Sequence, residues 1–238
     1  MNVVRAATVG DVETVKQWLS APRHRHPVHA GLVLHLAAFS GYDNICQLVL
    51  NSGHVSDDDI AIALSQACCD NQLSTAQLLV RHGHINTQNL TEALLDACVN
   101  GYTRIVRWLI SDVMTLSHTD RITWLLIAAC ARGDMSDIQQ LATQVDSDVT
   151  RVMSQALRVA CYRGRDDVVK WLTSHTTADV SSRGVIYSVR GEVTSLMAAC
   201  NLSKCGIVRR LLQCVTPHTV NMMSGNTRDT ALHLIISS

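Results

Sequence analysis

The sequence predicts an all-α fold, a helical solenoid of about seven to eight helix-turn-helix repeats. A motif of two small residues, two variable residues and a glycine recurs along the chain, with its first six copies 30 to 32 residues apart. Apolar residues with the period of an α-helix lie on both sides of each copy. With 238 residues the chain is also longer than a usual single-core domain, and a linear array of repeats accommodates that length.

The small-residue motif marks the end of a first helix in each repeat. Its glycine site falls at positions 10, 41, 71, 101, 133, 164 and 203, with asparagine at 71 and serine at 203. Glycine adopts positive φ at no steric cost, so it ends the first helix and lets the chain reverse. The complete copies are Ala6-Ala7-Thr8-Val9-Gly10, Ala37-Ala38-Phe39-Ser40-Gly41, Ala97-Cys98-Val99-Asn100-Gly101, Ala129-Cys130-Ala131-Arg132-Gly133 and Ala160-Cys161-Tyr162-Arg163-Gly164.

Apolar patterns place one helix before each turn and one after it. A Leu-x-x-Ala-(Ala/Cys) pattern precedes the turn at 34–38, 64–68, 94–98, 126–130, 157–161 and 196–200. After the turn, apolar pairs recur at i, i+1, i+4 and i+5, which is one face of a second helix. The clearest copies are 105–109, 168–172 and 207–212.

These residues resemble the ankyrin repeat, whose pattern runs T-x-L-H-x-A-A-x-x-G followed by an apolar helix. Thr230-Ala231-Leu232-His233 matches its opening, and Leu34-His35-Leu36-Ala37-Ala38 with Gly41 matches the body. Ser65, Leu95, Ile127 and Arg158 stand where the family has histidine. A tetratricopeptide array is disfavoured because its period is about 34 and its Trp-Leu-Gly-Tyr signal is absent.

The whole chain, residues 1–238, is expected to form a single array. Its approximate repeats are 1–30, 31–59, 60–89, 90–120, 121–150, 151–190 and 191–226, with an incomplete repeat at 227–238. The short period implies stunted hairpin loops in the middle repeats, whereas residues 178–191 predict a longer projecting loop. Since neither end offers a clear polar cap, we expect further sequence to follow Ser238.

Composition argues against export, membrane insertion and nucleic-acid binding. Twenty basic and twenty acidic residues cancel, so no global field attracts a polyanion. The longest apolar run, 122–131, is half of what a membrane helix needs, and the acidic amino terminus lacks a signal peptide. Nine cysteines without an export signal indicate a reducing, cytoplasmic location.

No residues point to catalysis, a cofactor or a metal. The recurring cysteines Cys68, Cys98, Cys130, Cys161 and Cys200 are predicted to pack as small core residues, because stacked repeats lie about 10 Å apart, too far for a shared zinc. Histidines 24, 26 and 29 are the densest ligand-capable set, but Pro27 and interspersed arginines favour a flexible loop there. Trp18, Trp108 and Trp171 are expected on second helices, as core or half-exposed packing residues.

The ankyrin resemblance implies a protein partner bound on the inner, concave face of the repeats. Within each motif the small pair stays constant while its neighbours change, which is the internal evidence for a recognition surface. The two variable positions give Phe39 and Ser40, Cys69 and Asp70, Val99 and Asn100, Ala131 and Arg132, Tyr162 and Arg163, Asn201 and Leu202. The position before the small pair adds Leu36, Gln66, Asp96, Ala128, Val159 and Ala198.

Charge on this face suggests what the partner carries. Arg132, Arg158, Arg163 and Arg165 concentrate positive charge on repeats five and six, while Asp70 and Asp96 leave repeats three and four mildly acidic. The hypothesis is a partner with an acidic segment near repeats five and six, and the alternative is an ordinary solvated surface. Two functions stay open: a protein-binding scaffold, or the targeting or regulatory arm of a larger enzyme, receptor or channel continuing beyond residue 238.

Overall fold

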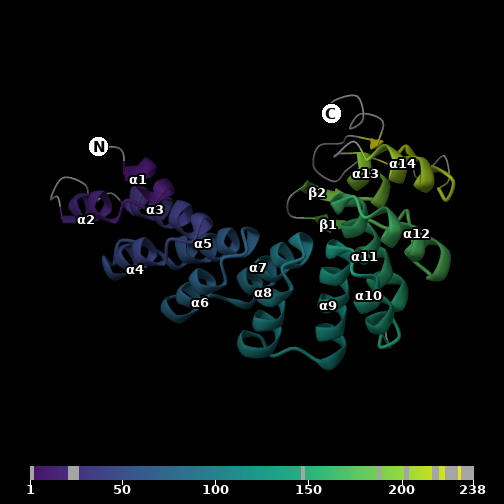
Figure 1. The fold of residues 1–238 in the computed structure, drawn as a ribbon, viewed down its shortest axis with the longest axis horizontal. Coiled ribbons are helices and arrows are strands. Elements are labelled where there is room, and N and C mark those ends of the chain that lie inside the picture. Colours follow the sequence, from purple (N-terminus) through teal and green to yellow (C-terminus); the bar gives the residue numbers. More distant parts are fainter. Residues whose placement is uncertain are drawn as a thin grey trace. The chain divides into compact units, whose positions relative to one another are not determined.

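The computed structural model describes residues 3–20, 27–145, 148–186, 189–200, 204–215, 220–222 and 230–231. These residues form helices in successive pairs, which confirms the predicted all-α repeat solenoid, with one short β-hairpin in addition (Figure 1). The chain divides into two compact bodies, Met1–Ala97 and Cys98–Ser238. Each body is described separately below.

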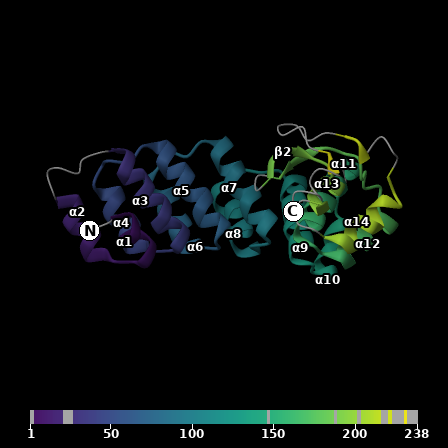
Figure 2. The same ribbon diagram turned by 90° about the horizontal axis from the view of Figure 1, so that it is seen from above.

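The N-terminal body stacks its first helices against one another and its second helices in a parallel row. Helices α1, α3 and α5 are neighbours in one row and α2, α4 and α6 in the other, an arrangement visible from two directions (Figures 1 and 2). The bounds are α1 (Val3–Val9), α2 (Val12–Ser20), α3 (Pro27–Ser40), α4 (Asp43–Asn51), α5 (Asp57–Cys69), α6 (Leu73–His82) and α7 (Thr87–Asn100), whose last turn belongs to the other body.

The C-terminal body continues the same pairing. Its first helices α9, α11 and α13 pack in sequence, and α12 packs on α14. A π-helical turn, η1 (Leu109–Val113), extends the second helix of repeat four. The bounds are α8 (Thr103–Trp108), α9 (His118–Arg132), α10 (Met135–Ala142), α11 (Val149–Arg163), α12 (Asp166–His175), β1 (Gly184–Ile186), β2 (Val189–Val193), α13 (Ser195–Cys200) and α14 (Cys205–Leu212).

Small residues at the carboxyl end of each first helix are fully buried, as predicted. Ala37 and Ala38 have no exposed surface, and the same holds for the recurring cysteines 68, 98, 130, 161 and 200. All five cysteines occupy the same place near the end of α5, α7, α9, α11 and α13. Interior packing is as dense as a crystal, so a larger side chain at these sites would push neighbouring helices apart.

The turns after α1, α3, α5, α7, α9 and α11 use the left-handed conformation that the glycine pattern predicts. Asn71, which replaces glycine in repeat three, adopts φ of 60°, and Gly101 adopts φ of 75°. Asparagine is the non-glycine residue best suited to this region. At Gly101 a Cβ atom would also lie 2.7 Å from Cγ and 3.2 Å from the backbone nitrogen of Arg132, so both conformation and space require glycine.

Replacing Gly101 with alanine is expected to lower the free energy of unfolding by about 1–2 kcal/mol, because alanine resists positive φ and its Cβ meets fixed backbone. Asn71→Gly is the matched control and is expected to cost nothing, since glycine relieves the same conformation. Thermal denaturation followed by circular dichroism measures both. A melting temperature for Gly101→Ala equal to that of the parent would contradict the assigned turn.

The loops between repeats are short in the middle of the chain and long before α13, again as predicted. Residues 52–56, 83–86 and 114–117 connect successive repeats without strands. By contrast, residues 176–194 include the antiparallel pair β1 and β2, with a register irregularity between Val185 and Ile186. The predicted projecting loop is therefore a β-hairpin finger.

Arg158 anchors this finger to the repeat stack. Its side chain is buried on α11, and Nη1 donates hydrogen bonds to the carbonyl oxygen of Ser182 at 3.2 Å and to Oγ of the same residue at 3.3 Å. A Cβ atom on Gly184 would lie 2.0 Å from Nη2 of Arg158, so the absence of a side chain there admits the guanidinium. Arg158 occupies the site of the family's histidine and takes on a different structural role.

Arg158→Met is expected to loosen the finger, because methionine retains the aliphatic stem but donates nothing to Ser182. Trypsin cleavage after the exposed Arg183 should accelerate several-fold, and amides at 182–186 should exchange faster with deuterium. Arg151→Met, on an exposed position of the same helix, is the control and should change neither rate. An unchanged exchange profile for Arg158→Met would mean that the guanidinium does not hold the finger.

Candidate interaction face on the first helices

The predicted interface residues belong to the first helices and to the turns that end them, and the exposed and half-buried side chains of these helices are here called the first-helix face. Phe39 is 45% exposed and the Arg132 side chain 43% exposed, so both are accessible. Asn201 and Leu202 lie outside the described residues. The remaining members are half-buried: Ser40, Gln66, Asp70, Asp96, Asn100, Tyr162 and Arg163.

Several positions expected on this face belong instead to the core. Ala128, Val159 and Ala198, which precede the small pair, are at most 1% exposed, and Val99 and Ala131 are equally buried. The side chain just before the small pair is half-buried in α3, α5 and α7, whereas it is buried in α9, α11 and α13. The usable face is therefore smaller in the C-terminal body than the motif register predicts.

The basic cluster expected on repeats five and six is also smaller than predicted. Arg158 is only 5% exposed and holds the finger, so its contribution to a surface charge was wrongly expected. Arg165 donates from Nε to the carbonyl oxygen of Ala131 at 2.8 Å, which ties α12 to the end of α9. Arg132 and Arg163 remain as the basic residues of this face.

Arg163 and Asn100, two predicted interface residues 63 positions apart, are brought together by the stack. Nη1 of Arg163 lies 3.4 Å from Oδ1 of Asn100, near the long limit of a hydrogen bond. Arg132 donates over similar distances, 3.2 Å from Nη1 to Oγ1 of Thr103 and 3.4 Å from Nη2 to Oδ2 of Asp134.

In the N-terminal body, Asp96 on α7 is the most perturbed acid of the face. Burial raises the pKa of its carboxyl to about 6, although hydrogen bonds from Cys69 and Ser65 act in the opposite direction. The carboxyl remains mostly ionised at neutral pH. Ser65 occupies the site of the family's histidine and here serves as one of its hydrogen-bond partners.

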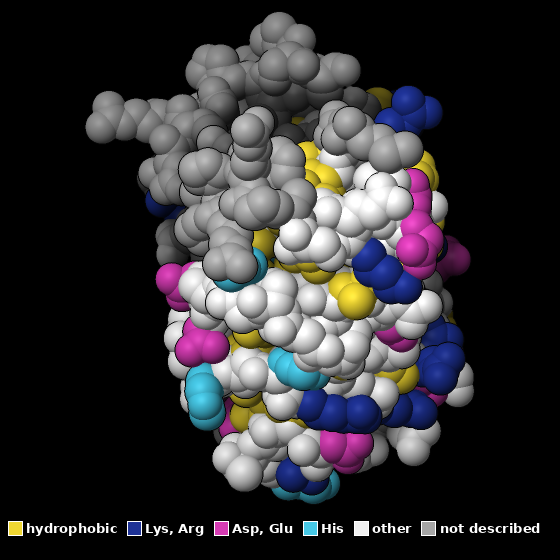
Figure 3. Space-filling model, turned by 90° about the vertical axis from the view of Figure 1, so that its left-hand side faces the viewer, with side chains coloured by type: hydrophobic (Ala, Val, Ile, Leu, Met, Phe, Trp, Pro, Cys, Tyr) yellow, Lys and Arg dark blue, Asp and Glu magenta, His cyan; other side chains and the backbone are white. Residues whose placement is uncertain are grey.

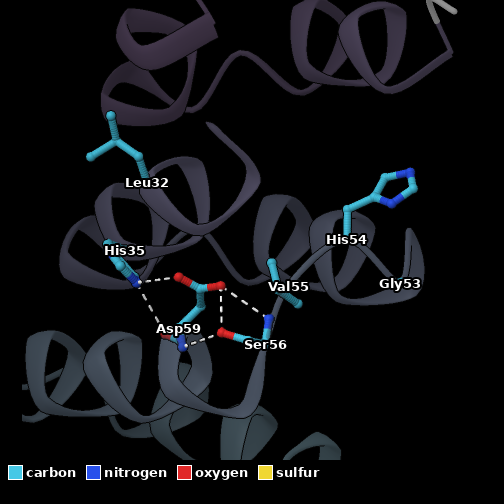
Figure 4. A pocket seen from close by; sticks show the side chains of 7 residues that line it. All are labelled: Leu32, His35, Gly53, His54, Val55, Ser56 and Asp59. Carbon is cyan, nitrogen blue, oxygen red and sulfur yellow. Dashed lines mark hydrogen bonds and ion pairs between the residues drawn. The ribbon is translucent and has the colours of Figure 1, made fainter. Parts of the chain in front are cut away.

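A shallow hollow of about 670 Å³ opens beside α3 and α5 (Figure 4). Asp59 organises it: Oδ2 accepts hydrogen bonds from the Ser56 amide at 3.0 Å and from Oγ of Ser56 at 2.8 Å, while Oγ of Ser56 accepts from the Asp59 amide at 3.1 Å. This reciprocal arrangement is a capping box at the start of α5. The lining residues are Leu32, His35, Gly53, His54, Val55, Ser56 and Asp59.

His35 faces the same carboxylate from the neighbouring repeat. Its Nε2 lies 3.1 Å from the Asp59 carbonyl oxygen and 3.7 Å from Oδ1. Burial lowers the pKa of His35 more than the Asp59 carboxylate raises it, so the contact is a hydrogen bond of a neutral imidazole at neutral pH. Although serine, aspartate and histidine meet here, the carboxylate stands between the other two. The Ser56 hydroxyl donates to the carboxylate and not to the imidazole, so the order of a serine, histidine and aspartate triad is not formed.

The recurring cysteines near the ends of the first helices behave as core residues. All nine cysteines of the chain are free thiols, and burial raises the pKa of Cys130 and Cys161 far above the ordinary value and that of Cys46 to about 12. A thiol, unlike a thiolate, is a poor nucleophile and metal ligand. Among the described residues no three histidine, cysteine or acidic side chains gather as a metal site would need.

Alkylation of the native protein at pH 8 is expected to modify Cys205 and Cys214, which are exposed, and to leave Cys130 and Cys161 unmodified. The reason is that burial both blocks access and keeps the inner thiols protonated. Mass spectrometry of iodoacetamide-treated protein, digested after the reaction, measures the labelling. The control is the same reaction in denaturant, where all nine cysteines should react. Rapid labelling of Cys161 in the native protein would contradict its burial.

The geometry defines a helical-repeat interaction protein, and the comparisons identify its family. The family model for ankyrin repeats, in three copies, matches residues 34–120 and 94–184, together more than half of the chain. The chain therefore belongs to the ankyrin repeat family, whose folds are interaction modules without catalytic machinery. Comparison with the sequences of curated proteins finds no match.

Among solved structures the chain is similar to the ankyrin repeat domain of human ASB11. The two share 17% sequence identity, the match covers 98% of this chain and 91% of that one, and the TM-score is 0.42. The family assignment rests on the sequence model and on the helix pairs described above. In the described parts of the chain, every helix is too short or too polar to cross a membrane.

Proposed function

We propose that this chain is a cytoplasmic scaffold that binds a protein partner through the first-helix face, with residues 1–238 acting as one array. One contrast supports this proposal above others. In the described motifs the paired small residues are buried, whereas the residues next to them differ between repeats and some of them, such as Phe39 and Arg132, reach the surface. Packing explains the constant pair, but it does not require Phe39 to be aromatic or Arg132 to be charged.

The partner carries an acidic segment that contacts Arg132 and Arg163. Arg163 donates to the neutral amide oxygen of Asn100 at 3.4 Å, and Arg132 forms an ion pair with Asp134 at 3.4 Å; a partner carboxylate would give both guanidinium groups shorter, charge-assisted hydrogen bonds. Tyr162, half-buried beside Arg163, supplies an aromatic contact of the kind that dominates interface energetics. Free thiols at all nine cysteines agree with a reducing compartment.

Reversing both charges, in Arg132→Glu with Arg163→Glu, is expected to abolish partner capture, because each new carboxylate would face the acidic segment of the partner. Affinity capture from cell extract on the tagged full chain, followed by mass spectrometry, gives the partner and its recovery. The matched control is Lys170→Glu with Arg209→Glu, two exposed reversals on the second helices α12 and α14. Equal recovery with the parent and the Arg132/Arg163 variant would refute the acidic-segment contact.

A further inference from the structure

Charge is distributed unevenly along this chain, although it cancels overall. Between residues 30 and 97 the sequence has no lysine and a single arginine, Arg81, against seven acidic residues, which leaves a formal charge of −6. Arg81 lies in the last turn of the second helix α6, away from the first-helix row. The acidic residues are Asp43, Asp57, Asp58, Asp59, Asp70, Glu92 and Asp96.

Most of this acidity lies along the first helices of the N-terminal body. Asp57, Asp58 and Asp59 form the first turn of α5, and Asp70 follows its last turn. Glu92 and Asp96 are one turn apart on α7. From α3 to residue 97 no basic residue other than histidine belongs to a first helix, and Arg5, exposed on α1, borders this region.

An apolar stripe runs along the same helices. Leu32 is 42% exposed and Phe39 45% exposed, with the half-buried Leu36 between them at the spacing of one face of α3. Ile62, which is 48% exposed, occupies the position on neighbouring α5 that Leu32 occupies on α3. Leu32, Leu36, Phe39 and Ile62 are called the α3–α5 patch below.

The patch is not explained by the core. The opposite side of α3 already supplies Ala30, Leu34 and Ala37, all at most 1% exposed, to the interior. Exposed apolar residues are ordinary when scattered, but three of the six large ones among the described residues gather on these two helices. On the described surface that faces the viewer in Figure 3, hydrophobic side chains form small separate groups.

Carboxylates border the patch on α5. Ile62 lies one turn after Asp58 and Asp59, and Asp70 lies at the far end of the same helix. The hollow shown in Figure 4 is lined by Leu32 of the patch and by Asp59, so it adjoins both the apolar stripe and the carboxylates. Asp59 is partly committed to Ser56 and His35, whereas Asp58 is exposed.

We propose that the α3–α5 patch docks a segment of the protein partner that is both apolar and basic. The inference rests on the proposed protein-binding function and names the chemistry of one partner segment. Burial of large apolar side chains supplies the affinity for this segment. The carboxylates around the patch pair with its lysine or arginine side chains and so select a positively charged segment. Nucleic acid and anionic membrane surfaces are excluded because the same carboxylates repel them.

A random-peptide display selection on the full chain tests the proposal directly. Binders are first depleted on the variant Phe39→Ser with Ile62→Ser, which should fold normally because both side chains are exposed; its thermal melting curve checks this. The expected survivors carry net positive charge and at least two large apolar residues. No enrichment, or enrichment of neutral or acidic peptides, overturns the proposal.

A fluorescently labelled peptide from the selection then gives affinities on matched variants. Phe39→Ser with Ile62→Ser should raise Kd at least about tenfold, and Asp58→Asn with Asp70→Asn several-fold, with a smaller difference at high salt. The same Kd for the parent and these variants overturns the proposal. The proposal is also overturned if the parent chain forms a concentration-dependent dimer that is lost only in the Phe39→Ser with Ile62→Ser variant. In that case the patch binds a second copy of the chain.

The Arg132→Glu with Arg163→Glu variant separates this inference from the proposed function. The basic peptide should bind that variant with the parent's Kd, because these arginines lie in the other body. If partner capture depends on Arg132 and Arg163 but the peptide selection fails, the proposed function stands and only docking at the α3–α5 patch is refuted. Failure of both would remove the recognition role of the first-helix face.

Discussion

Close approach of neighbouring first helices is the constraint on which the rest of this structure depends. Each helix pair has an apolar side that it cannot bury alone, so stability comes from the pairs on either side of it. The approach is possible because alanine and cysteine end the first helices, as in Ala37-Ala38 and Ala160-Cys161, where no side-chain surface remains exposed. The low aromatic content of 4% follows, since rings would not fit between the helices.

Hydrogen bonds and ion pairs between neighbouring repeats also hold the stack together. Thr75 on α6 donates to Asp43 on α4, and Arg210 on α14 pairs with Asp166 on α12 at 3.2 Å. Arg165 reaches back to the last turn of α9. Of the four arginines expected on the face, Arg158 and Arg165 thus serve the scaffold, which is why a count of arginines overstated the charge of the face.

The first-helix face presents different chemistry in the two bodies. In the N-terminal body it is apolar at Phe39 and Ile62 and acidic around them, whereas in the C-terminal body its charged members are Arg132 and Arg163. A formal net charge of zero therefore describes neither surface. Binding that uses such local fields depends on the pairing of individual groups at close range, because charges beyond about 10 Å are screened at physiological salt.

The sequence alone determined the repeat, since the interactions that specify it are local. Each segment of about thirty residues contains the helix period, the small pair and a turn residue that tolerates positive φ. Even Asn71 was identifiable as a turn residue by its position. A Ser-x-x-Asp signal at Ser56 would likewise have located the start of α5. The family and the burial of the recurring cysteines followed from this periodicity.

Only the tertiary structure decided which register positions are covered and which long side chains turn inward. Val159 occupies the same register as the half-buried Asp96 yet is buried, and Arg158, an apparent surface charge, holds a hairpin 24 residues away. Arg163 reaches Asn100 across an intervening repeat. Periodicity reports where a residue sits on its own helix, but these contacts depend on how far and at what angle the neighbouring repeats stack, and that geometry arises from packing between segments distant in sequence.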